Sequence, residues 1–163
     1  MLLLGNVLPA PAQQPPAPTV QANAVTQAAA QQGVQGCLGR IQQVSSALGF
    51  SAQAGALLMI PPTESDSRLI PLAMEVPIEG GNSAYVGIDF APNQANGCGA
   101  AYDAVVVWKQ SCKSVAGKQF ADLKEVGKLK NNITVLDGGL NIKVFLMPAG
   151  NNGCVSIKRE VVL

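Results

Sequence analysis

Histidine is absent from this 163-residue chain, and charged residues are scarce. The missing imidazole excludes Ser-His-Asp and Cys-His catalytic arrangements, and it leaves cysteine as the only common zinc ligand besides carboxylates. Charged residues make up 13% of the chain, against about 25% in a typical globular domain. The formal net charge is +1, so no overall field attracts nucleic acid or an anionic membrane.

Several motifs and residue types are also missing or rare. The sequence has no phosphate-binding loop, dinucleotide fingerprint, nucleophile elbow or HExxH motif, so no cofactor is predicted. Four Phe, two Tyr and one Trp are the only aromatic residues, and this scarcity argues against nucleic-acid binding. No run of 18 apolar residues occurs, so the sequence predicts no membrane span.

The N-terminal region carries no charge before Arg40. We interpret residues 1–12 (MLLLGNVLPAPA) as the remnant of a secretory signal, because a short apolar run precedes an A-x-A pattern. The alternative is an ordinary apolar N-terminus. Residues 13–36 are rich in Ala, Gln and Pro, and we predict a flexible tether with transient helix around Val20–Gln32. Residues 37–163 are expected to form the folded domain.

Hydrophobic periodicity predicts an α+β domain. Apolar residues at helical spacing predict a helix over Cys37–Gly49, and alternation predicts a strand over Arg68–Ile78 with a return strand over Ser83–Phe90. Pro71 and Pro77 place part of the first of these strands at an edge or beside a bulge. Further strands are expected at 56–62, 101–110, 133–136, 141–148 and 154–163, with two short helical pieces after Ser111. The prediction is one mostly antiparallel sheet of six or seven strands, with two helices on one face and two disulfides.

The four cysteines, Cys37, Cys98, Cys112 and Cys154, indicate two disulfides rather than a metal site, because the gaps between them are wide and no C-x2-C pair is present. Residues 101–110 contain no turn former, so they span about 30 Å as a strand or about 15 Å as a helix. A disulfide brings its Cα atoms to about 4.4–6.8 Å. Cys98 and Cys112 are therefore not expected to pair. We favour Cys37–Cys98 with Cys112–Cys154; the other possibility is Cys37–Cys112 with Cys98–Cys154.

Candidate catalytic groups are few. Asp89 and Asp103 are able to form a carboxylate pair across neighbouring strands, but two separate solvent-facing residues are the preferred interpretation. Ser111 near Lys113 has the composition of a Ser–Lys pair, whereas Ser111 also suits the N-cap of a helix, and we prefer the cap. Residues 101–110 carry apolar side chains on both faces, which indicates an interior strand. Tyr102 and Trp108 of this strand are therefore expected in the core rather than in a ligand platform. No catalytic, cofactor-binding or metal-binding residue is predicted.

Lysines are concentrated after the predicted central strand. Lys109, Lys113, Lys118 and Lys124 are the candidate partner-binding residues, and a solvated helix face is the alternative interpretation. The sequence predicts an exported, non-catalytic binding module, such as an inhibitor or a cell-envelope accessory protein, in the periplasm or outside the cell. Its expected partner is another protein of that compartment. A secreted hydrolase with a histidine-free site and a self-assembling surface protein are the alternatives.

Overall fold

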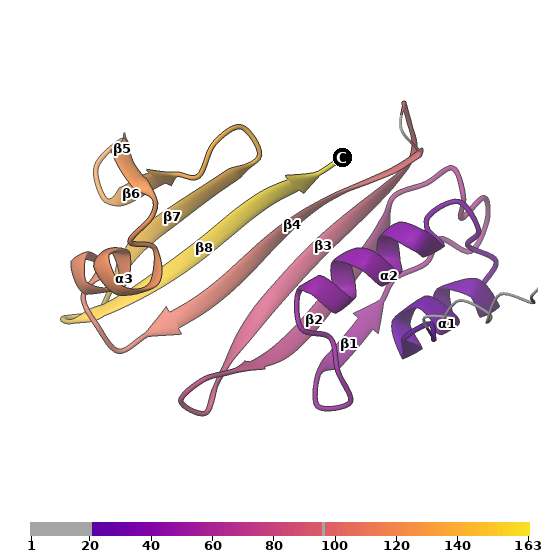
Figure 1. Ribbon diagram of the computed structural model, residues 1–163, viewed down its shortest axis with the longest axis horizontal. Helices are drawn as coiled ribbons and strands as arrows, with labels where there is room; N and C mark the ends of the chain where they lie inside the picture. Colours follow the sequence, from indigo (N-terminus) through magenta and orange to yellow (C-terminus); the bar gives the residue numbers. More distant parts are fainter. Residues whose placement is uncertain (1–20, 96) are drawn as a thin grey trace, which may run out of the picture.

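The computed structural model describes residues 21–95 and 97–163, which form one eight-stranded antiparallel sheet and three helices (Figure 1). The helices are α1 (Ala24–Gln31), α2 (Leu38–Ala47) and α3 (Cys112–Gln119). The strands are β1 (Gly55–Leu58), β2 (Ile70–Ile78), β3 (Asn82–Gln94), β4 (Gly97–Trp108), β5 (Lys124–Leu129), β6 (Ile133–Asp137), β7 (Ile142–Ala149) and β8 (Gly153–Val162). The α+β class is confirmed, with one strand and one helix more than the sequence predicted.

The strand order is β1-β2-β3-β4-β8-β7-β6-β5. Strands β1–β4 form one four-stranded meander and β5–β8 form a second, and we call these the N-terminal and C-terminal meanders. They join where β4 pairs with β8, from Ala100 opposite Val162 to Trp108 opposite Cys154. This β4–β8 seam makes β4 an interior strand, as its apolar residues on both faces predicted.

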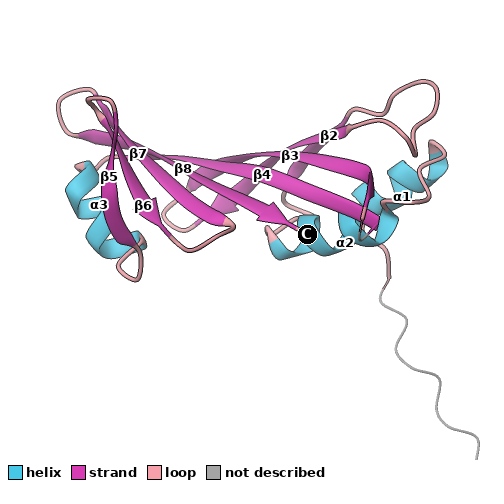
Figure 2. Ribbon diagram, turned by 90° about the horizontal axis from the view of Figure 1, so that it is seen from above, coloured by secondary structure: helices cyan, strands magenta, loops and turns pink. Residues whose placement is uncertain are grey.

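All three helices cover the same face of the sheet (Figure 2). Side chains alternate between the two faces of a strand, and on β4 the even-numbered residues from Tyr102 to Trp108 point towards the helices. Tyr102 belongs to the core beneath α2, whereas Trp108 packs against the core beneath α3. We call this side the helix face and the opposite side the open face, because no described element lies on it.

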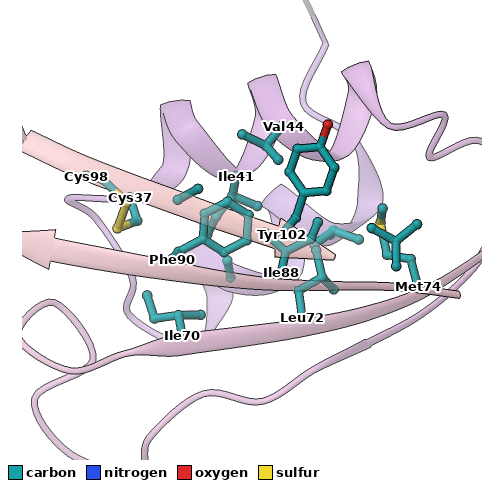
Figure 3. Close-up of a cluster of buried hydrophobic side chains, with 14 of the residues drawn as sticks. Cys37, Ile41, Val44, Ile70, Leu72, Met74, Ile88, Phe90, Cys98 and Tyr102 are labelled. Atoms are coloured by element: carbon teal, nitrogen blue, oxygen red, sulfur yellow. A yellow bond between two sulfur atoms is a disulfide. The ribbon is translucent and has the colours of Figure 1, made fainter. Parts of the chain in front are cut away.

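The larger core lies between the N-terminal meander and helices α1 and α2 (Figure 3). Phe90 and Ile41 are fully buried there. In Figure 3, Phe90, Ile88 and Leu72 lie beneath Ile41 and Val44 of α2, and the hydroxyl of Tyr102 points out of the cluster. The Cys37–Cys98 disulfide ties the start of α2 to β4 at one end of this core.

A smaller core lies beneath α3 in the C-terminal meander. Val115 of α3 is fully buried against side chains of β6, β7 and β8. The Cys112–Cys154 disulfide joins the first residue of α3 to the start of β8. Both disulfides therefore have the pairing that the sequence argument favoured, and Cys98 and Cys112 lie towards opposite ends of β4.

The described part of the segment predicted as a flexible tether, residues 21–36, contains a packed helix. Residues 24–31 form α1, in which Val25 and Ala29 are buried, and Val34 is fully buried after it. The Asn23 side chain accepts from Thr26 N–H as the N-cap and donates to Ser45 of α2. Small side chains and these polar contacts order a segment whose composition indicated disorder. Residues 1–20, including the predicted signal remnant, lie outside the described residues.

The segment after α3 is also different from the prediction. A second helical piece was expected there, but residues 124–129 form the edge strand β5, and Val126 of this strand is 55% exposed. The register between β5 and β6 shifts between Glu125 and Gly127, and Gly127 has φ of +143°. A bulge at this glycine replaces the predicted helix.

β2 is the second strand from one edge of the sheet, and its two prolines are compatible with this position. Pro71 accepts a hydrogen bond from Met59 N–H, so its carbonyl points towards the β1 side of β2. Backbone polar groups alternate in direction along a strand, so Pro77 points the same way. β1 pairs with β2 only from Leu72 to Glu75. Pro77 therefore lies on an uncovered stretch, and the edge prediction is confirmed for that part of the strand.

Candidate functional site

The open face carries a continuous apolar surface at the centre of the sheet. Val105 of β4 lies between Tyr85 of β3 and Ile157 of β8 in register, and Ile157 lies next to Phe145 of β7. In the next row of side chains, Val107 lies beside Val155, which lies beside Met147. We call these side chains, together with Val135 of β6, the apolar band: Tyr85, Val105, Val107, Val135, Phe145, Met147, Val155 and Ile157.

The apolar band is accessible to a partner. Tyr85 is 56% exposed, Val107 is 62% exposed and Met147 is 37% exposed. The remaining members are half-buried, because neighbouring side chains on the same face shield one another. Scattered exposed apolar residues are normal on protein surfaces, whereas the members of the apolar band are neighbours of one another.

A row of charges borders the apolar band. Asp103 of β4 lies opposite Arg159 of β8, and Arg159 lies opposite Lys143 of β7. The row continues to Asp137 of β6 and Lys124 of β5. Ion pairs join Arg159 to Asp103 at 3.5 Å and Lys143 to Asp137 at 2.8 Å. The open face therefore has an apolar part and a charged border that contains both signs.

Within this border, the surroundings of Asp137 favour its ionised form. The pKa of Asp137 lies below its ordinary value, and the largest cause is the hydrogen bond that the Lys143 side chain donates to its carboxylate. The Gly139 N–H donates a second hydrogen bond at 3.0 Å, and the charge of Lys124 adds to the effect. Asp137 is therefore held in its ionised form by Lys143 and by the Gly139 N–H.

Both edges of the sheet disfavour the addition of another strand. β1 has only four residues, and Pro71 and Pro77 interrupt the donors of the neighbouring β2. β5 carries Lys124 and Lys128 and contains the bulge at Gly127. Short strands, prolines, lysines and bulges are the features with which sheets prevent edge-to-edge pairing. The edges are thus less suited to a partner than the open face.

The helix face has an open hollow of about 730 Å³ between the β2–β3 turn and α3. Val106 and Trp108 line it, together with the polar side chains of Gln110 and Gln119. The indole N–H of Trp108 donates to Ser156 Oγ at 2.7 Å, which fixes the ring at the seam. Trp108 thus combines the core position predicted for it with partial access to this hollow.

A second polar group spans the seam on the helix face. The Tyr102 hydroxyl donates to Glu160, and Lys158 donates to both Glu160 at 2.8 Å and the Tyr102 hydroxyl at 2.9 Å. The pKa of Tyr102 is raised, mainly because burial disfavours its charged form. Burial opposes ionisation of Lys158 and Glu160, yet their mutual hydrogen bonds outweigh it, so the pKa of Lys158 is raised and that of Glu160 is lowered. Each member is satisfied by the other two, which is the pattern of a structural cross-link.

The weak catalytic candidates do not assemble. Asp89 lies opposite Ala101 and Asp103 lies opposite Gly87, so the two carboxylates are diagonal neighbours on the open face rather than a facing pair. Asp103 pairs with Arg159 instead. Ser111 Oγ accepts a hydrogen bond from Ser114 N–H at 3.3 Å, which confirms the N-cap interpretation.

The candidate partner-binding lysines lie on different elements. Lys113 and Lys118 belong to α3, Lys124 begins β5, and Lys109 follows the last residue of β4. All four are exposed. They do not form the single helix face that the lysine spacing indicated, and only Lys124 belongs to the charged border of the open face.

Sequence analysis missed the apolar band, although its signal was present. Apolar residues on both faces of residues 101–109 indicated an interior strand, and the alternation groups Val105 and Val107 on one of these faces. The structure shows that no described element covers this face. Arg159 was missed because its partner on β4 becomes apparent only from the pairing of β4 with β8.

Searches for other kinds of site give no candidate. Within residues 21–95 and 97–163, no three cysteine or carboxylate side chains gather as a metal-binding group. In the same part of the chain, no helix has the length and apolar character to cross a membrane. Comparisons of the chain with protein-family models, with curated proteins and with solved structures find no significant match.

Proposed function

We propose that this protein is an exported, non-catalytic interaction module that binds a protein partner through the open face of its sheet. The observation that carries the proposal is the apolar band, which crosses β3, β4, β8, β7 and β6 without a covering element. Burying such side chains contributes about 25 cal/mol per Å² of apolar surface. The charged border then supplies orientation, because Asp103 and Arg159 offer one charge of each sign.

The composition of the band also suits recognition of a protein. Tyr85, Phe145 and Met147 are residue types that are enriched at the centres of protein interfaces. The band lies on the open surface of a twisted sheet rather than in the enclosed concave shape of a small-molecule site. Of the lysines predicted to bind a partner, Lys124 is retained as part of the charged border, whereas Lys109, Lys113 and Lys118 are not needed.

Export and the absence of catalysis complete the proposal. The two disulfides are consistent with an oxidising compartment, either periplasmic or extracellular. Of the polar groups considered for catalysis, Ser111 caps α3 and Asp103 forms an ion pair with Arg159. These roles explain the residues without a reaction, and they support an interaction module over a hydrolase.

The test compares partner capture by two matched valine variants. Val107→Glu places a charge within the apolar band, whereas Val126→Glu places the same charge at a similarly exposed position on β5. Immobilised full-length protein is incubated with an extract of the native compartment, and captured proteins are quantified. We expect capture that Val107→Glu abolishes and Val126→Glu preserves. Capture that is unaffected by Val107→Glu would contradict the proposed surface.

A further inference from the structure

We infer that the partner of the open face is a second copy of this chain, stacked face to face about a two-fold axis along the β4–β8 seam. This inference rests on the proposed function, since it names the protein that covers the apolar band. Two sheets that pack face to face lie about 10 Å apart with their strands about 30° from parallel. The register of the sheet decides which residues meet in such a pair.

A two-fold axis that runs nearly along the strands, midway between β4 and β8, preserves each row of side chains and exchanges the two strands. Val105 of one copy then lies over Ile157 of the second copy, because these residues are register partners within the sheet. Val107 likewise lies over Val155 of the second copy. Every such contact occurs twice, as an isologous interface requires.

The neighbouring strands extend the same match. β3 of one copy lies over β7 of the second, because each is the outer neighbour of a seam strand. Tyr85 is in the row of Val105, and Phe145 is in the row of Ile157, so these two aromatic side chains meet across the interface. The two apolar bands therefore overlap along their centres.

The charged border is self-complementary about this axis. Asp103 and Arg159 are register partners on the two seam strands, so the axis places Asp103 of each copy over Arg159 of the other. Their side chains are 38% and 58% exposed, which leaves both available to a partner. Two copies would form a four-charge network with alternating signs. This charge arrangement is what selects a second copy over an arbitrary protein.

The open face is large enough for a stable pair. The six strands from β2 to β6 in the sheet order, spaced about 4.8 Å apart, and four rows of side chains about 6.8 Å apart give a footprint of roughly 800 Å² before twist is considered. A standard interface buries about 800 Å² per partner. The protected edges disfavour assembly through added strands, so the pairing closes at two copies instead of propagating along the sheet.

The first experiment measures the mass of the full-length protein by light scattering and sedimentation equilibrium, from dilute protein up to about 1 mM, where even weak pairing is populated. We expect a reversible monomer–dimer equilibrium. Val107→Glu should raise the dimer dissociation constant by about tenfold or more, because it buries an unpaired charge, while Val126→Glu should leave it unchanged. A monomer at every concentration overturns the inference.

The second experiment uses charge reversal to test the axis itself. Asp103→Arg gives a chain with two positive charges at the seam, and Arg159→Asp gives a chain with two negative charges. Each variant should fail to pair with itself, since like charges would face across the axis. A mixture of the two should form a heterodimer, because each positive side chain then faces a negative one. Failure of the mixture to pair, when both variants fold as judged by circular dichroism, overturns the arrangement.

These outcomes separate the inference from the proposed function. If the wild-type protein is monomeric but captures another protein in a Val107-dependent way, the proposed function holds and a different protein covers the band. If neither dimer nor Val107-dependent capture is found, both fail. Dimers that persist in Val107→Glu and Val126→Glu alike would place the interface elsewhere and contradict the second copy on the open face.

Discussion

The two meanders have the same strand count but different means of stabilisation. The N-terminal meander and its two helices bury 17 side chains in their core, whereas the C-terminal meander and α3 bury five. Each core is closed by one disulfide. The comparison shows that similar sheet topology does not imply similar stability, because the area buried by covering helices differs between the halves.

The disulfides close loops of comparable length, with sequence separations of 61 for Cys37–Cys98 and 42 for Cys112–Cys154. Loop-closure entropy depends only on the logarithm of that length, so the estimate is about 4 kcal/mol for each bond. The bonds therefore contribute similar amounts to unequal cores. The C-terminal meander depends on its disulfide for a larger share of its stability.

Phe90→Ala is the largest expected disruption, because it removes the largest fully buried side chain of the N-terminal core. We expect a loss of about 3–5 kcal/mol in the free energy of unfolding. Urea titration followed by the fluorescence of Trp108 measures it, since this tryptophan lies at the seam. Leu140→Ala, at a fully exposed position, is the control with a change within about 0.5 kcal/mol. A loss for Phe90→Ala below about 1 kcal/mol would show that the N-terminal core is not dominant.

Removing each disulfide separately tests the unequal dependence of the two halves. Replacing both cysteines of one bond by serine should cost about 2–4 kcal/mol for either bond. Hydrogen exchange should then show local opening of α3, β6 and β7 without Cys112–Cys154, while β2 and β3 stay protected. Without Cys37–Cys98, the strands of the larger core should retain their protection. An identical exchange pattern in the two variants would refute the comparison.

Glu160→Gln tests a smaller effect, the link between the halves at the Tyr102–Lys158–Glu160 group. The folded-state pKa of Glu160 lies below its ordinary 4.5, so the folded protein binds fewer protons than the unfolded chain in acid. The stabilisation is therefore fully present above about pH 4.5 and is lost as the pH falls through the lower folded-state pKa. We expect a cost of about 1 kcal/mol at pH 7, given the partial exposure of the group.

The measurement is the free energy of unfolding of wild type and Glu160→Gln across the acid range. The difference between them should shrink towards zero as the pH falls. Glu64→Gln is the matched control, because it breaks only the exposed ion pair with Arg68, worth about 0.5 kcal/mol or less. A difference for Glu160→Gln that stays constant with pH would contradict the ionic contribution.

Much of the fold could be predicted from local patterns. Alternation located β2 and β3, and the span of the strand between Cys98 and Cys112 excluded their pairing. β5 was missed because its Lys and Gly residues alternate poorly and all six residues are exposed. α1 was missed as an ordered helix because its stability comes from partners far away in the sequence. Its N-cap residue Asn23 donates to Ser45. After the helix, the N–H groups of Gln35 and Gly36 donate to the Asp66 carboxylate.

The candidate site was less predictable than the fold. Apolar residues on both faces of β4 were interpreted as the sign of an interior strand, and the sequence does not show which of these faces is left uncovered. The charge pair of Asp103 and Arg159 joins residues far apart in the chain. Such a pair depends on which strands become neighbours, and local propensity does not determine this.

The β4–β8 seam also has a consequence for the order of folding. Within each meander every strand pairs with a sequence neighbour, whereas the seam joins β4 to a strand about 50 residues later. Contacts between distant segments form slowly, because the closure entropy of the intervening chain precedes their gain. We expect the two meanders to form first and the seam to close last. Refolding followed by pulsed hydrogen exchange should then find the amides that bond between β4 and β8 protected after those that bond between β2 and β3 and between β6 and β7.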